Sequence, residues 1–244
     1  MSVIWYAPGE GLGKPSRAAA VCRHIPGSVV VRVGVWKTPL DHAGVEYVQV
    51  WSDEAAPAVI EGLNPDLLVV DQSPDAPEVQ HFREAKTLHL YRFGRSFTES
   101  PGVLIEGSRE GWVDMWPVLY YGPENLPSRE ESREHYDIPD DIHLTVVEPS
   151  VKTNTPLRDE SMEGDKWTKV VRHWPGVGLL AGADRVVGAP GYNLWNEVNA
   201  LGITDADWSP IENQADQQLR MNEPWREYTG NKDRALADYI MEMA

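Results

Sequence analysis

The first half of the chain alternates short apolar runs with segments of helical or loop character. Residues 29–35 are mostly valine, which suits a strand buried on both faces of a sheet. Strands that alternate with helices predict a parallel sheet with right-handed crossovers. Further strands are expected over residues 2–7, 45–50, 67–70, 88–91 and 103–105, with helices beginning near Pro15 and spanning 55–62 and 78–85.

The composition changes between residues 116 and 141, where proline and charged residues become frequent. We expect this segment, which includes an exposed helix over 128–136, to link two domains of residues 1–117 and 118–244. The sequence therefore predicts two Rossmann-like α/β domains with a cleft between them. In the second domain, strands are expected over 142–147, 169–174 and 184–189, and helices over 191–201, 213–221 and 234–243.

The chain is acidic, with 22 Lys and Arg residues against 38 Asp and Glu residues and a net charge of −16. That charge disfavours non-specific binding to nucleic acid or to anionic membranes. Cys22 is the only cysteine, which excludes an intrachain disulfide and a cysteine metal cluster. No apolar run is long enough for a membrane span and no secretory signal is recognisable, so we expect a cytoplasmic chain without membrane insertion.

The first candidate site is the glycine-rich segment of residues 9–14, between a predicted strand and a predicted helix. Glycines let the backbone approach a ligand closely, and a helix N-terminus favours an anion or a polar oxygen. The spacing of Gly9, Gly11 and Gly13 matches neither the dinucleotide-binding fingerprint nor the P-loop. A tight turn without a ligand, with Lys14 in solvent, is the competing interpretation.

A second glycine turn, over residues 188–193, again joins a strand to a helix N-terminus. Asn193 and Glu197 are four residues apart and therefore lie one turn apart on the same side of that helix. A carboxylate there can accept both hydroxyl groups of a ribose, as an acidic residue does in dinucleotide folds. Equally, Asn193 can be a plain N-cap and Glu197 a solvated helix residue.

The polar stretch Asp216-Gln217-Gln218 follows further along the chain. Its amide and carboxylate groups supply donors and acceptors that suit sugar hydroxyl groups. An exposed helix with an Asp216–Arg220 pair is the competing interpretation.

The apolar strand over residues 67–70 ends in a carboxylate, Asp71. The carboxyl ends of parallel strands line the ligand crevice in open α/β sheets, so Asp71 stands where a general base could act. A carboxylate that caps a turn or a helix is at least as good an interpretation of Asp71.

Metal-binding patterns are weak, and no metal site is predicted. The D-x-D of Asp205 and Asp207 falls in a segment expected to be a loop, and such pairs are common by chance. The seven histidines show no spacing typical of a metal site.

Taken in order, these segments resemble the GT-B glycosyltransferases, in particular the branch of the peptidoglycan lipid-intermediate N-acetylglucosaminyltransferase. Residues 11–17 resemble its G-x-G-H-x-x-R loop, and residues 65–71 its P-D-hydrophobic-D strand. Residues 188–202 resemble its G-x-x-G-x-N-x-x-x-E-x-x-x-x-G segment, and residues 216–220 the D-Q-x-x-x-A/R segment that follows. The likeness spans most of the chain and implies a GT-B fold with an abbreviated C-terminal domain.

The resemblance implies transfer of a glycosyl group from a nucleotide sugar, UDP-linked in this branch, to an acceptor hydroxyl. The role of Asp71 as the catalytic base rests on its place at the strand end and not on the resemblance. Glu197 would hold the ribose, and Asn193 would face the diphosphate. The resemblance implies no cofactor and no metal, because backbone N–H groups and a helix dipole stabilise the leaving diphosphate. The full donor-binding set would be Gly191, Tyr192, Asn193, Glu197, Asp216, Gln217 and Gln218, and Gly11, Gly13, Lys14 and Ser16 would complete the cleft from the acceptor side.

The sequence departs from this branch at three places, one of which is residues 152–166, a segment too short for the helix–strand–helix usually found there. Lys14 stands where the branch has a histidine, and Glu148-Pro149-Ser150 stands where relatives have a glycine-serine turn. The sequence does not distinguish between two acceptor classes, a small molecule and a hydroxymethylated base in DNA. A nucleotide-sugar epimerase or hydrolase of the same fold and a non-catalytic nucleotide-binding module are the competing functions.

Overall fold

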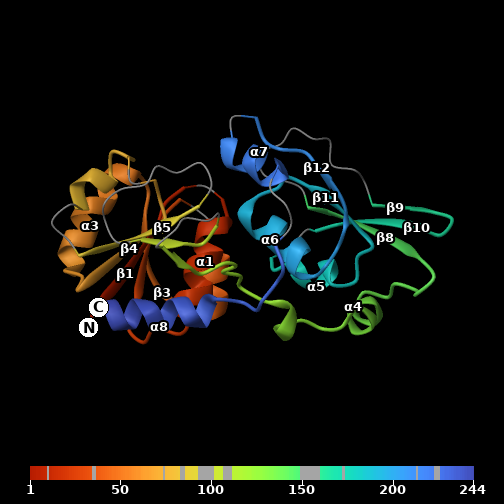
Figure 1. The fold of residues 1–244 in the computed structure, drawn as a ribbon, viewed down its shortest axis with the longest axis horizontal. Helices are drawn as coiled ribbons and strands as arrows, with labels where there is room; N and C mark the ends of the chain where they lie inside the picture. Colours follow the sequence, from red (N-terminus) through yellow and green to blue (C-terminus); the bar gives the residue numbers. More distant parts are fainter. Residues whose placement is uncertain are drawn as a thin grey trace. The chain divides into compact units, whose positions relative to one another are not determined.

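The structure is a computed structural model that describes residues 1–9, 11–34, 37–73, 75–82, 86–92, 102–106, 112–148, 160–171, 174–212, 214–222 and 226–244. The chain forms two compact units (Figure 1). Unit 1 comprises Met1–Tyr120 together with Asn231–Ala244, and unit 2 comprises Tyr121–Gly230.

Unit 1 contains a seven-stranded sheet in the order β3-β2-β1-β4-β5-β6-β7, with every neighbouring pair parallel. The chain adds β2 and β3 on one side of β1 and then β4 to β7 on the other, so the strand order reverses between β1 and β4. Open α/β sheets bind ligands at such a switch point. The strands are β1 (Val3–Ala7), β2 (Val29–Val33), β3 (Glu46–Val50), β4 (Leu67–Val70), β5 (Thr87–Tyr91), β6 (Gly102–Leu104) and β7 (Val113–Asp114).

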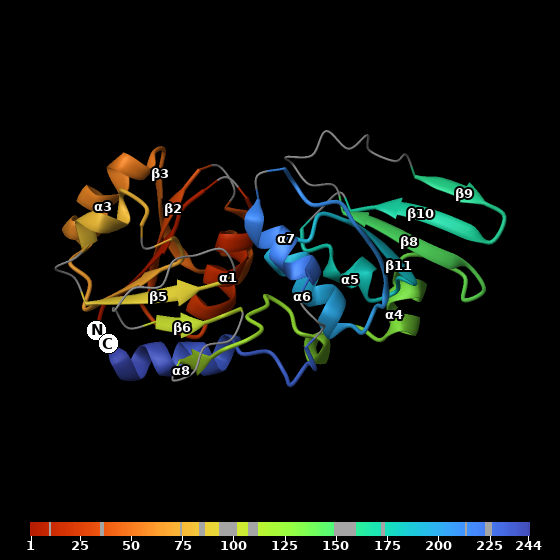
Figure 2. The ribbon, with the colours of Figure 1, turned by 45° about the horizontal axis from the view of Figure 1, so that its top comes forward.

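Apolar side chains cover both faces of this sheet, as the valine-rich run predicts. Successive strand residues point to opposite faces. Ile4, Val31 and Leu68 pack on the face that carries α3 (Ala56–Leu63) and the 3-10 turn Val79–Phe82. α1 (Gly13–Cys22) packs on β1 and β2 and is flanked by α2 (Thr38–Ala43) and α8 (Asp233–Met243); Figures 1 and 2 show α8 beside α1.

The helix expected over residues 234–243 packs on unit 1, which corrects its predicted place in the second domain. Leu236, Ala237 and Ile240 of α8 are fully buried, and Asp233 accepts a 2.6 Å hydrogen bond from Arg23. An amphipathic helix docks wherever a matching apolar face is available, and its position in the sequence does not specify which face that is. The domain boundary expected at 117/118 lies at 120/121.

Unit 2 contains a five-stranded sheet in the order β12-β11-β8-β10-β9. β9 is antiparallel to β10, and the other neighbours are parallel. The chain places β10 on one side of β8 and then β11 on the other, so the switch point lies between β8 and β11. The strands are β8 (His143–Glu148), β9 (Ser161–Glu163), β10 (Lys166–Val170), β11 (Arg185–Gly188) and β12 (Asp205–Trp208).

The helices of unit 2 are α4 (Arg129–His135), α5 (Val177–Leu180), α6 (Tyr192–Ala200) and α7 (Ala215–Asn222), preceded by a 3-10 turn over Pro123–Asn125. A capping box begins α4: Ser128 Oγ accepts from the Glu131 amide at 3.2 Å, and Glu131 Oε2 accepts from the Ser128 amide at 2.8 Å. Within the described part of the chain, no helix has both the length and the apolar character needed to cross a bilayer.

Three predicted elements differ from the structure. The helix expected over 78–85 is a 3-10 turn over Val79–Phe82, and residues 83–85 lie outside the described residues. The strand expected over 169–174 lies earlier in the chain, over Lys166–Val170. The expected loop around Asp205 and Asp207 is strand β12, whose alternation puts both carboxylates on one face, 3.6 Å and 3.4 Å from the guanidinium of Arg185.

Candidate functional site

The glycine-rich segment of unit 1 lies at the switch point between β1 and β4. Gly9 has a φ of +100°, and its carbonyl accepts a 2.5 Å hydrogen bond from the buried Arg32. Lys14 Nζ donates to Gln72 Oε1 at 3.1 Å, and Gln72 Nε2 donates to Glu78 Oε1 at 3.2 Å. This chain of polar groups links the start of α1 to the segment after β4.

The predicted cleft-loop residues all lie at the start of α1, which begins at Gly13 without a side-chain cap. A Cβ at Gly11 would meet open space, and one at Gly13 would lie 3.7 Å from Arg17 Nη1. Ser16 is buried, and its Oγ has no hydrogen-bond partner among the residues that the structure describes. Lys14, by contrast, is only half-buried.

Asp71 directly follows β4 and is fully buried. Its two carboxylate oxygens accept hydrogen bonds from Arg17 Nε at 3.0 Å and Nη2 at 3.1 Å. The side chains of Arg17 and Asp71 are 1% and 0% exposed, so a buried bidentate ion pair joins α1 to the end of β4. The structure therefore gives Asp71 a structural partner, and its role as a general base stays a prediction.

A buried tyrosine lies near the same edge of the sheet. Tyr6 donates to Asp53 Oδ1 at 3.1 Å. Burial, together with the charges of Asp53 and Glu78, raises the pKa of Tyr6 well above its usual value. Tyr6 is therefore a fixed hydrogen-bond donor in this environment and not an acid.

In unit 2, the second glycine turn joins the end of β11 to α6 at the switch point. A Cβ at Gly188 would lie 2.7 Å from Leu194 Cδ2 and 3.2 Å from the Glu148 carbonyl oxygen, so the absence of a side chain here lets Leu194 of α6 pack closely on the strand ends. Gly191 is the N-cap of α6 and Asn193 is not. Asn193 Oδ1 is buried and has no hydrogen-bond partner within the described residues.

Glu197 lies one turn beyond Asn193 on α6 and is half-buried. Burial and the charge of Glu148 raise the pKa of Glu197 to about 8. Burial likewise raises the pKa of Glu148, the last residue of β8, to about 7. The two carboxyl groups therefore lie close enough to interact electrostatically.

The predicted sugar-binding stretch lies on α7, where its members face different surroundings. Gln217 is buried: its Oε1 accepts from the Ile211 amide at 2.8 Å and its Nε2 donates to Gln214 at 2.8 Å. Gln218 is exposed. Gln217 already uses its amide within the unit, so its contact with a donor sugar stays a prediction that needs this amide to change partners.

The first residue of that stretch, Asp216, is paired with Arg220 at 2.9 Å. Arg220 is fully buried and donates to the Pro190 carbonyl at 3.0 Å. α7 thereby holds the Pro190–Gly191 turn, and with it the start of α6. Tyr192, also predicted to bind the donor, is buried, and its carbonyl accepts from Asn196 at 2.7 Å.

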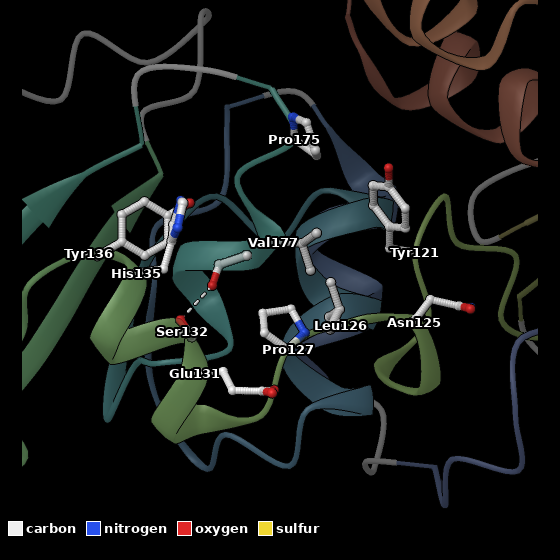
Figure 3. A pocket seen from close by; sticks show the side chains of 11 residues that line it. Tyr121, Asn125, Leu126, Pro127, Glu131, Ser132, His135, Tyr136, Pro175 and Val177 are labelled. Atoms are coloured by element: carbon white, nitrogen blue, oxygen red, sulfur yellow. Dashed lines mark hydrogen bonds between the residues drawn. The ribbon is translucent and has the colours of Figure 1, made fainter.

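Unit 2 also contains a pocket of about 520 Å³, a volume typical of small-molecule sites (Figure 3). Ser132 Oγ, which lines it, donates to the Gly178 carbonyl at 2.7 Å and ties α4 to α5. None of the predicted donor-binding residues lines this pocket. Its mainly apolar walls include Tyr121, Leu126, Pro127, Tyr136, Pro175 and Val177.

Comparison with known proteins gives similarity in fold without similarity in sequence. No family model and no curated protein matches the chain. MurG from Acinetobacter baumannii superposes with a TM-score of 0.52 and 12% identity, over 91% of this chain and 82% of MurG. The spinosyn rhamnosyltransferase SpnG superposes with a TM-score of 0.57 and 10% identity, over 90% of this chain and 83% of SpnG. The chain has the GT-B fold.

A third GT-B structure, HepE from Anabaena in complex with UDP and glucose, superposes with a TM-score of 0.53 and 10% identity, over all of this chain and 97% of HepE. These superpositions confirm the GT-B fold that the resemblance implied. They leave the roles of individual GT-B residues in this chain as predictions.

Arg17 and Glu148 were not assigned a role from the sequence. Arg220 was expected only as the partner of Asp216, a pair that the structure contains, and its bond to the Pro190 carbonyl was not expected. Arg17 and Arg220 lie within helices, where an arginine ordinarily indicates a solvated side chain. A signal for Arg17 is the run of small or apolar residues that follows it on the same helix, Ala18–Cys22. The only sequence signal at Glu148 was that it stands where relatives have a glycine-serine turn.

Proposed function

We propose that this GT-B chain transfers a glycosyl group from a UDP-linked sugar to an acceptor hydroxyl without a bound metal ion. One observation carries the proposal. The glycine turn brings the N-terminus of α6 to the carboxyl ends of β8 and β11, with Asn193 and Glu197 one turn apart on that helix. The HepE complex with UDP supports the choice of nucleotide.

In this proposal unit 2 binds the donor. The N–H groups and the dipole at the start of α6 would hold the diphosphate, with the amide of Asn193 beside it. Glu197 would accept hydrogen bonds from the ribose hydroxyl groups. Arg220 would act indirectly, because it holds the Pro190 turn from which α6 begins.

During transfer, the acceptor oxygen forms a bond to the anomeric carbon as the bond from that carbon to the β-phosphate oxygen breaks. UDP leaves with the electron pair, and the α6 N-terminus stabilises the added charge. Asp71 is the proposed acceptor of the hydroxyl proton. Since Asp71 is paired with Arg17, the acceptor hydroxyl would have to join that pair as a third partner.

A thermal-shift titration with UDP and UDP-glucose, in EDTA and in magnesium, tests donor binding. A ligand at about 100 times its Kd stabilises by about 2.7 kcal/mol. We expect a shift that EDTA leaves unchanged and that Glu197→Ala weakens. Glu163→Ala, at an exposed position on β9, is the matched control and should bind as the wild type does. Absence of any shift with UDP or UDP-glucose would refute the proposal.

Incubation with UDP-glucose and a panel of hydroxyl acceptors separates the competing functions. A glycosylated product supports transfer. Release of free glucose without an acceptor would instead indicate a hydrolase, and an altered sugar still attached to UDP would indicate an epimerase. Binding without turnover would indicate a nucleotide-binding module.

A further inference from the structure

Glu148 occupies a distinctive place at the unit 2 switch point. It ends β8, and its Cα is in register with Gly188 at the end of β11. A Cβ built on Gly188 would lie 3.7 Å from Glu148 Cβ and 2.7 Å from Leu194 Cδ2 of α6. The Glu148 side chain therefore leaves the sheet on the face that α6 covers.

Glu197 extends this arrangement along α6. It lies three residues after Leu194, which places it on the neighbouring part of the same helix surface. The charge of Glu148 contributes to the raised pKa of Glu197, and burial raises the pKa of both groups. Two carboxyl groups thus lie together near the first turns of α6, where the proposed function puts a diphosphate.

Other charged groups of this sheet and of α7 have partners of their own, and Arg185 lies at the opposite end of β11 from Gly188. None of the described contacts joins them to Glu148. On β10 the ammonium of Lys169 lies 5.8 Å from the centre of the Trp167 ring, and next to β10 the carboxylate of Glu160 accepts from the Val170 amide at 3.3 Å. On α7, Arg220 pairs with Asp216, and on β11 and β12, Arg185 pairs with Asp205 and Asp207.

We propose that Glu148 makes this site prefer the glycosyl ester of a nucleoside diphosphate over the free nucleoside diphosphate. The inference rests on the proposed function and adds a specificity residue to it. A terminal phosphate has a second ionisation near pH 6, so free UDP carries one more negative charge at pH 8 than a UDP-sugar does. A carboxylate beside the α6 N-terminus repels that extra charge. Glu148 would then favour donor binding and promote release of the UDP product.

The protonation behaviour of Glu148 makes the inference measurable. Burial holds its pKa near 7, so Glu148 is mostly ionised at pH 8 and mostly protonated at pH 6. Discrimination against UDP should therefore be strong at pH 8 and weak at pH 6. Glu148→Gln keeps the shape of the side chain but has no charge at either pH.

The test is titration calorimetry with UDP and with UDP-glucose at both pH values and constant ionic strength. At pH 8, Glu148→Gln should lower the ratio of the UDP Kd to the UDP-glucose Kd by about tenfold, the effect of one unit charge at close range. At pH 6 the ratios of wild type and variant should converge. Glu148→Ser is a second neutral variant, and Glu163→Gln on the exposed edge strand is the control, expected to match the wild type throughout.

Each outcome decides between the inference and its alternatives. A tighter UDP complex in both neutral variants supports it. An unchanged ratio, or an equal loss of affinity for both ligands, overturns it and assigns Glu148 to a structural or hydroxyl-binding role while leaving donor binding intact. If neither ligand binds to wild type or variants, the proposed function fails as well.

Discussion

The buried ion pair between Arg17 and Asp71 gives the sharpest test of how unit 1 is held together. Asp71→Asn removes one charge and leaves the other in a site where both side chains are at most 1% exposed. Breaking a buried pair by removing one partner costs about 3–5 kcal/mol, because the remaining charge is no longer compensated. For a unit of roughly 130 residues, about 3–4 °C per kcal/mol gives a fall in Tm of about 9–20 °C.

The double variant Arg17→Met, Asp71→Leu separates the cost of an uncompensated charge from the value of the pair. Apolar replacements of similar volume are often neutral or stabilising when a buried pair is removed whole. We therefore expect the double variant to melt close to the wild type, by circular dichroism and by urea unfolding. Glu61→Gln, at an exposed position of α3, is the control for loss of a carboxylate.

Two results would refute this reasoning. One is a Tm for Asp71→Asn within about 2 °C of the wild type, which would mean that the pair contributes little. The other is a double variant as unstable as the single one. The double variant also tests the proposed base, since it should bind UDP normally yet transfer no sugar. Full transfer activity would remove Asp71 from the reaction.

Three further predictions concern single residues. Cys22 is 3% exposed and burial raises its pKa to about 12, so Ellman's reagent should modify it only after denaturation. Burial and a neighbouring carboxylate raise the pKa of Glu197 from its ordinary 4.5 to about 8, so the folded state holds the proton more tightly. The free energy of unfolding should then fall as pH rises through that range, and Glu197→Gln should flatten the slope in urea titrations. Arg220→Met removes the 3.0 Å hydrogen bond to the Pro190 carbonyl and the ion pair with Asp216. It should lower the free energy of unfolding by about 3 kcal/mol and weaken UDP binding. An unchanged Kd for UDP in titration calorimetry would contradict this prediction.

Most elements of the fold could be predicted from the sequence, because strands buried on both faces require apolar runs and tight turns require glycine. The valine run of β2 and the glycine turn before α6 are of this kind. The GT-B resemblance rested on four segments, and two of them are glycine turns, where few residue types are tolerated: a Cβ at Gly188 would lie 2.7 Å from Leu194 Cδ2.

The features that sequence reasoning missed depend on contacts between distant segments. Nothing local says that Arg17 meets Asp71 or that Arg220 meets the Pro190 carbonyl, since each pair is brought together by the packing of a helix on a strand end. The strand at residues 205–208 was missed because the segment lies between Gly202 and Pro210, which indicate a loop. Its two aspartates are tolerated in a strand because Arg185 on the neighbouring strand offsets their charges.

Because α8 belongs to unit 1 but follows unit 2 in the sequence, unit 1 cannot finish folding early in synthesis. The face of α1 that α8 covers cannot be completed until residues 231–244 have been synthesised, after the whole of unit 2. At about 5–20 residues per second, the intervening segment delays that step by on the order of ten seconds. Unit 2 is contiguous in sequence, so it can fold on the ribosome while the earlier unit still waits for its last helix. A nonsense mutation just after residue 230 would therefore destabilise unit 1, although the codons it removes follow those of unit 2.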